Sequence, residues 1–130
     1  MFIDTNIFLE IFLKDKNYER CKRLILDLMK KNAVFYTSDF VVYSCMLIIY
    51  NKLGSVQHLR NFLIFINSIK ISVIRPGLKD MFKAAEFIEK YKLDFDDALV
   101  VGCMTENEIK ELASYDGDFD KVKEINVFRP

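Results

Sequence analysis

The sequence predicts an α/β fold in which a central parallel sheet of about five strands carries helices on both faces. Three observations lead to this fold class. Short β-prone segments alternate with longer segments of helical periodicity along the chain. Residues that cap or stop helices stand at the junctions between these segments. The 130 residues are expected to form one domain, and their 52% hydrophobic content provides a core without a disulfide or metal staple.

The first half of the chain is expected to contain two strands and four helices. Residues 1–3 form a short apolar strand that ends at Asp4, and helices follow over residues 6–13 and 18–31. Residues 33–37 are a second strand, after which Ser38 and Asp39 can cap a very apolar helix over residues 40–52. Gly54 stops this helix, and another is expected over residues 55–69.

The second half continues the alternation of strands and helices. A strand over residues 70–74 is broken by an Arg-Pro-Gly sequence, and an amphipathic helix follows over residues 78–91. A buried helix over residues 98–104 leads to strands over residues 109–114 and 125–128. Because helices alternate with the strands, the sheet is expected to be parallel.

Charge and cysteine content exclude several classes of protein. Lys+Arg and Asp+Glu balance at 19 each, so no global basic field indicates nucleic acid, although local patches remain open. Three cysteines without a CxxC spacing indicate reduced thiols in a cytoplasmic protein, and His58 fits a surface helix better than a zinc site. The most apolar run, residues 40–50, is too short to span a membrane, so no membrane association is expected.

Two groups of helical residues leave alternatives open. The apolar helices over residues 40–69 form a partner or dimer surface if their outer faces are exposed, or plain core if they pack together. Because they are unusually apolar, we expect a homodimer. The basic residues over 14–31 are most simply a solvated helix face, with phosphate contact as a secondary interpretation.

Aspartates cluster at three places that a parallel sheet brings to one edge. Asp4 follows the first strand, Asp97 opens a buried helix, and Asp116 follows a later strand with Asp118 close by. Asp4 alone would also suit a simple helix cap. Gathered carboxylates raise one another's pKa, and a hard divalent cation, Mg²⁺ or Mn²⁺, would neutralise them.

Three segments resemble PIN-domain ribonucleases, including the VapC-type toxins of toxin–antitoxin pairs: FIDTN (2–6), LDFDDAL (93–99) and ASYDGDF (113–119). The resemblance spans essentially the whole chain. It implies a three-layer α/β/α fold, cleavage of RNA with Mg²⁺ or Mn²⁺, and a small antitoxin protein as partner. It also implies the functional residues, which are Asp4, Asp97 and Asp116 as catalytic metal ligands, Asp118 as an alternative ligand, and Thr5, Asn6, Ser44 and Ser114 in support.

One position departs from the family pattern. The family usually carries a glutamate on the helix after the second strand, where this sequence has Ser44, and neither Glu10 nor Asp39 clearly projects to the same place. The sequence therefore leaves two functions open. One is a metal-dependent endoribonuclease, and the other is a catalytically weakened scaffold that binds RNA or a protein. A receiver-like or phosphatase domain with Asp4 as nucleophile is disfavoured, because no Asp-x-Asp follows the first strand.

Overall fold

Five short strands form the centre of the molecule: β1 (Phe2–Ile3), β2 (Tyr36–Ser38), β3 (Ser72–Ile74), β4 (Glu111–Ala113) and β5 (Asn126–Phe128). The computed structural model describes residues 1–130. The strands lie in the order β3-β2-β1-β4-β5, and every neighbouring pair is parallel. The predicted number and direction of the strands are therefore confirmed, and β1 is the central strand.

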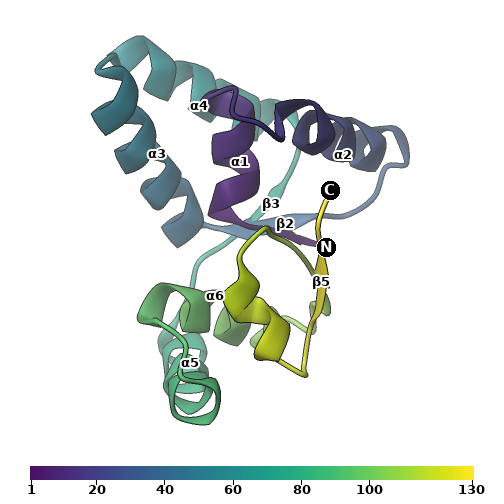
Figure 1. Cartoon of the computed structure of the whole chain (residues 1–130), viewed down its shortest axis with the longest axis vertical. Coiled ribbons are helices and arrows are strands. Elements are labelled where there is room, and N and C mark those ends of the chain that lie inside the picture. Colours follow the sequence, from purple (N-terminus) through teal and green to yellow (C-terminus); the bar gives the residue numbers. More distant parts are fainter.

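Six helices cover the two faces of the sheet: α1 (Thr5–Phe12), α2 (Tyr18–Lys30), α3 (Asp39–Leu53), α4 (Val56–Ser68), α5 (Leu78–Tyr91) and α6 (Phe95–Glu106). In Figure 1, α1 to α4 lie above the strands, and α5 and α6 lie below them. A 3₁₀ helix, η1 (Gly117–Lys121), follows β4. The predicted three-layer α/β/α fold is confirmed.

Both ends of α3 follow the expected capping residues. Ser38 Oγ accepts a hydrogen bond from the Val41 N–H at 3.2 Å, and Gly54 ends α3 with a φ of 61°. The sixth helix begins three residues earlier than predicted, at Phe95, so Asp96 and Asp97 lie in its first turn. Carboxylates are favourable there because the helix dipole places partial positive charge at that end.

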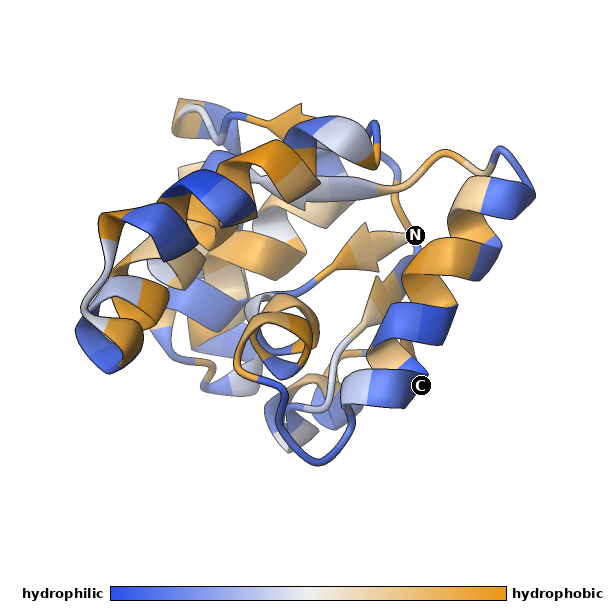
Figure 2. Cartoon of the chain, turned by 90° about the horizontal axis from the view of Figure 1, so that it is seen from above, coloured by the Kyte–Doolittle hydropathy of each residue, from blue (hydrophilic) through white to orange (hydrophobic).

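The core lies on both sides of β1, whose two residues are completely buried. Between α1 and α4, aromatic rings meet edge to face, with centroids 5.0 Å apart for Phe12 and Phe62 and 5.2 Å apart for Phe12 and Phe65. Figure 2 shows apolar strands in the centre, surrounded by helices that alternate between apolar and polar residues. No helix is both long and apolar enough to cross a membrane.

The alternatives for the apolar helices α3 and α4 are both met in part. Phe62 is completely buried against α1, which is the core interpretation. Other apolar side chains on these helices are largely exposed, which is the condition under which the sequence predicts a partner surface. The most exposed are Tyr43 at 61%, Leu47 at 62% and Ile64 at 65%.

Helices α5 and α6 pack unusually closely at Gly102. A Cβ atom at this position would lie 2.6 Å from the Asp80 carbonyl oxygen and 2.9 Å from the Ala84 nitrogen. Both distances are shorter than real contacts allow, so glycine permits the two helices to touch backbone to backbone. This packing fixes the position of α6, which carries Asp97 in its first turn.

Candidate metal centre

The acidic residues meet in a cavity of about 380 Å³ at the carboxyl ends of the central strands. Asp4 follows β1, Asp97 is in the first turn of α6, and Asp116 lies beyond β4. The opposite wall is largely apolar and comes mainly from α1 and α3. The cavity is lined by Asp4, Thr5, Asn6, Leu9, Phe40, Val41, Ser44, Leu47, Ile48, Asp96, Asp97, Val100 and Asp116.

The tightest group of carboxylates is formed by Asp97, Asp116 and Asp118. One carboxylate oxygen from each lies within 4.8 Å of the other two. The first two aspartates are half-buried, whereas Asp118 is exposed. Asp118, which the sequence suggests only as an alternative metal ligand, therefore belongs to this group, whereas Asp4 does not. Three convergent carboxylate oxygens are a suitable donor set for Mg²⁺ or Mn²⁺.

The carboxylate of Asp4 is directed to hydrogen-bond donors rather than to the other aspartates. Its Oδ1 accepts from the Thr5 N–H at 2.6 Å, so Asp4 also caps α1, as its helix-cap interpretation predicts. Its Oδ2 accepts from Asn6 Nδ2 at 2.6 Å and from Ser114 Oγ at 2.7 Å. Asp4 is nevertheless in the cavity wall beside Asp97 and Asp116, so both interpretations of this residue agree with its position.

Ser114 joins the ends of β1 and β4. Its buried hydroxyl donates to Asp4 and accepts from Asn6 Nδ2 at 2.9 Å and from the Asp116 N–H at 3.0 Å. Asn6 Oδ1 in turn accepts from the Tyr115 N–H at 3.1 Å. These bonds link Asp4 to the segment that carries Asp116 through Asn6 and Ser114, whose supporting roles stay a prediction.

Burial and repulsion from neighbouring carboxylates disfavour the ionised forms of Asp97 and Asp4. The pKa of Asp97 is raised to about 7, first by burial and then by the negative charges of the nearby aspartates, in the order Asp116, Asp96, Asp4 and Asp118. Burial also raises the pKa of Asp4, although hydrogen bonds from Ser114 and Thr5 act in the opposite direction. A bound cation would remove this repulsion, which is the electrostatic condition for a metal centre.

The position of the missing glutamate lies in the same cavity. Ser44 is half-buried on α3 and lines the wall next to the aspartates. The two residues considered as substitutes have other partners. Glu10 accepts from the Asn17 N–H at 2.7 Å, and Asp39 pairs with Arg75 at 3.3 Å. Neither lines the cavity, so α3 contributes a hydroxyl where the family usually has a carboxylate.

Two residues near the site were not selected from the sequence. Asp96 was assigned only to the helix start, but it lines the cavity; the true first turn of α6 would have shown this. Arg129 donates to the Asp116 carbonyl oxygen at 3.3 Å and to Asp120 Oδ1 at 2.6 Å. It therefore holds the segment that carries Asp116, and no local sequence pattern indicates that role.

The chain is similar to one protein family and to several solved structures. The family model for the PIN domain matches residues 1–125, whereas no curated protein matches the sequence. The solved VapC20 of Mycobacterium tuberculosis, a Sarcin-Ricin loop cleaving toxin, is 20% identical with a TM-score of 0.80, covering 99% of this chain and 98% of that one. VapBC2 from Rickettsia felis, bound to a promoter DNA fragment, is 16% identical with a TM-score of 0.79, covering 99% and 97%. VapBC-1 from nontypeable Haemophilus influenzae is 14% identical with a TM-score of 0.72, covering 98% and 96%.

Proposed function

Because the chain belongs to the PIN domain family, we propose that it is a metal-dependent endoribonuclease that hydrolyses phosphodiester bonds in RNA. The observation that carries the proposal is the convergence of Asp97, Asp116 and Asp118 within 4.8 Å. The half-buried Asp97, with its pKa raised to about 7, fits this chemistry because a cation would lower the cost of its ionisation.

In this proposal, some residues of the site bind the cation and others orient the metal-binding carboxylates. Mg²⁺ or Mn²⁺, when bound, would supply an activated water and offset charge on the phosphate oxygens. Asp97, Asp116 and Asp118 would hold the ion through their carboxylate oxygens. Asp4 would be a further metal ligand in the cavity wall. Hydrogen bonds from Thr5, Asn6 and Ser114 orient its carboxylate. No histidine base is required.

We further propose that the protein is the toxin of a toxin–antitoxin pair and acts in the cytoplasm with a small antitoxin protein as partner. The support is the similarity of the whole chain to VapC and VapBC structures. We also propose a homodimer, because α3 and α4 expose Tyr43, Leu47 and Ile64 to solvent. The three cysteines are buried and free, which suits a reducing compartment.

A second function is favoured by one specific observation, the serine at position 44 in the cavity wall. With one carboxylate fewer, the cavity has less charge with which to hold a divalent ion. The chain would then be a catalytically weakened PIN scaffold that binds RNA or a protein. Ribonuclease activity is our first choice because three carboxylates still converge without Ser44.

A metal titration combined with an RNA cleavage assay distinguishes these functions. The parent chain is expected to bind Mn²⁺ in isothermal titration and to cut RNA only when Mn²⁺ or Mg²⁺ is present. Asp97→Asn should lose both properties. Asp94→Asn removes one charge three residues away, at an exposed position outside the cavity, and should keep both. Metal binding without cleavage would support the scaffold, and absence of both would refute the ribonuclease.

A further inference from the structure

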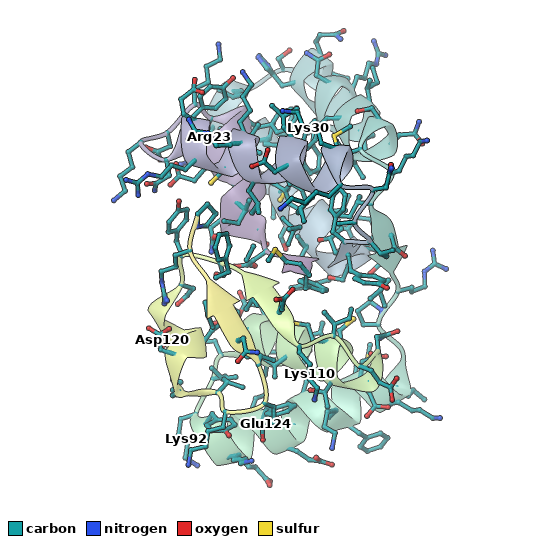
Figure 3. All side chains as sticks on the ribbon, turned by 90° about the vertical axis from the view of Figure 1, so that its right-hand side faces the viewer. Arg23, Lys30, Lys92, Lys110, Asp120 and Glu124 are labelled. Atoms are coloured by element: carbon teal, nitrogen blue, oxygen red, sulfur yellow. The ribbon has the colours of Figure 1, made fainter.

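A hollow of about 260 Å³, separate from the acidic cavity, lies between α2 and the end of β5. Two arginines of α2 and Phe128 of β5, a residue that is 45% exposed, contribute to its lining. In Figure 3, Arg23 lies on α2 above the free end of the yellow segment that contains β5. The complete lining is Arg20, Arg23, Leu24, Asp27, Phe128 and Pro130.

The two arginines of this hollow are exposed and have no ion-pair partner. The ion pairs of the structure engage other cations, namely Arg75, Lys83, Lys90, Lys121 and Arg129. One side-chain carboxylate, Asp27, also lines the hollow, so the two arginines and this aspartate together give the lining side chains an excess of one positive charge. The guanidinium group is planar and donates paired hydrogen bonds that match the oxygens of a phosphate group. The two arginines therefore suit the hollow to a phosphate group better than to an uncharged apolar ligand.

The hollow and the acidic cavity are connected through Tyr115. The Tyr115 hydroxyl donates to the Pro130 carbonyl oxygen at 2.8 Å, at the wall of the hollow. Its backbone N–H donates to Asn6, which lines the acidic cavity. The next residue in the chain is Asp116. Phe128 is also in register with Ala113 on the neighbouring strand, so the hollow and the cavity share one edge of the sheet.

Because the molecule has no net charge, attraction of a polyanionic substrate depends on local groups of cations. Lysine plus arginine equal aspartate plus glutamate in number, so there is no long-range attraction for RNA. The acidic cavity itself repels phosphate when no cation is bound. Affinity for RNA depends mainly on cations that contact the backbone, and these must come from a local group close to the cavity.

We propose that the hollow formed by Arg20, Arg23 and Phe128 is a subsite for the backbone of single-stranded RNA, next to the acidic cavity. This inference rests on the proposed ribonuclease function and adds the place where the substrate strand is held. The two guanidinium groups bind phosphate oxygens, and the exposed Phe128 ring offers a face for one base. The negative charge of Asp27 opposes this binding, so removing that charge should strengthen RNA binding, whereas removing the arginine charges should weaken it.

The test measures binding of a fluorescein-labelled single-stranded RNA in EDTA, where metal-dependent cleavage cannot proceed, across a series of salt concentrations. The double variant Arg20→Gln with Arg23→Gln should raise Kd roughly tenfold at about 50 mM salt and reduce the slope of log K against log salt by about 1.4. Asp27→Asn should lower Kd by roughly threefold, because it removes the opposing charge. The matched control is Lys110→Gln, an exposed cation distant from Arg23 in Figure 3, which should leave both quantities unchanged.

Each outcome decides the proposal. Equal Kd and salt slope in the parent and the double variant would overturn it, as would an equal loss in Lys110→Gln, because either result shows that no local subsite exists. A parent that binds no RNA would overturn it as well. Mn²⁺ binding should be the same in all these variants. A parent that binds RNA but never cleaves it contradicts the ribonuclease, while the differences in Kd still decide the subsite.

Discussion

Replacement of Asp97 with asparagine tests whether the acidic cavity is strained without a cation. The substitution keeps the shape of the side chain and removes the charge that four neighbouring aspartates oppose. The folded-state pKa lies above the ordinary value of 3.8, so the ionised group destabilises the fold fully above about pH 7. This destabilisation fades as the pH falls toward 3.8. Asp97→Asn should therefore stabilise the metal-free protein, and more so at high pH.

The expected magnitude follows from the shift in pKa. One pKa unit corresponds to about 1.36 kcal/mol, so the rise of roughly three units sets an upper value of about 4 kcal/mol. Because the Asp97 carboxyl is only half-buried, solvent screening reduces this to about 2 kcal/mol. For a chain of this length, that free energy raises Tm by roughly 6–10 °C. Less than half of this gain should remain at about pH 5, where most of the parent protein has already taken up the proton.

The assay is thermal unfolding in EDTA and in excess Mg²⁺, at about pH 8 and about pH 5. In the parent, Mg²⁺ should raise Tm by mass action, and in Asp97→Asn this rise should be much smaller. Asp94→Asn is the control, since Asp94 is exposed and outside the cavity. If Asp97→Asn and the parent melt at the same temperature at about pH 8, with and without Mg²⁺, there is no repulsion at this position and no metal centre.

Three further substitutions address other parts of the structure. Ser44→Glu restores the carboxylate of the family pattern. It should lower metal-free stability, tighten Mn²⁺ binding in isothermal titration and increase metal-dependent RNA cleavage. Equal or weaker Mn²⁺ affinity would place Ser44 outside the site. Ile64→Glu should convert the proposed homodimer into a soluble monomer in sedimentation at roughly tens of micromolar, and a parent that is already monomeric there contradicts the dimer. Gly102→Ala should destabilise the fold by roughly 1–3 kcal/mol in urea unfolding, because α5 and α6 must separate to admit the methyl group; an unchanged midpoint would show that the helices yield without cost.

The layers and the strand direction could be predicted because they depend on alternation along the sequence. Short apolar segments that end in a capping residue produced β1 before Asp4 and β2 before the helix that Ser38 caps. The three aspartates that follow strands or open helices also come together in one cavity. A parallel sheet places the carboxyl ends of all its strands at one edge, so the order of the elements predicts which residues become neighbours.

Finer relations depend on distances that the sequence does not contain. The tightest carboxylate group includes Asp118 rather than Asp4, since Ser114 and Asn6 draw the Asp4 carboxylate toward the strand ends. Arg129 reaches Asp116 from beyond β5, across a separation that no periodicity records. The sequence predicts the start of α6 three residues too late, so it does not predict that Asp96 lies in the first turn and lines the cavity.

The central place of β1 in the sheet determines when the acidic cavity can first form during synthesis of the chain. Asp4 receives a hydrogen bond from Ser114, which lies 110 residues further along the chain, and β1 pairs on one side with β4. Contacts between such distant segments form slowly, because a long loop must close before they are gained. On the ribosome, α1 to α4 can emerge and begin to pack while Asp4 still has neither Ser114 nor Asp116 beside it. A nascent chain therefore remains without its acidic cavity until residue 116 has been translated and has left the exit tunnel, which separates the synthesis of this protein from the onset of any RNA cleavage.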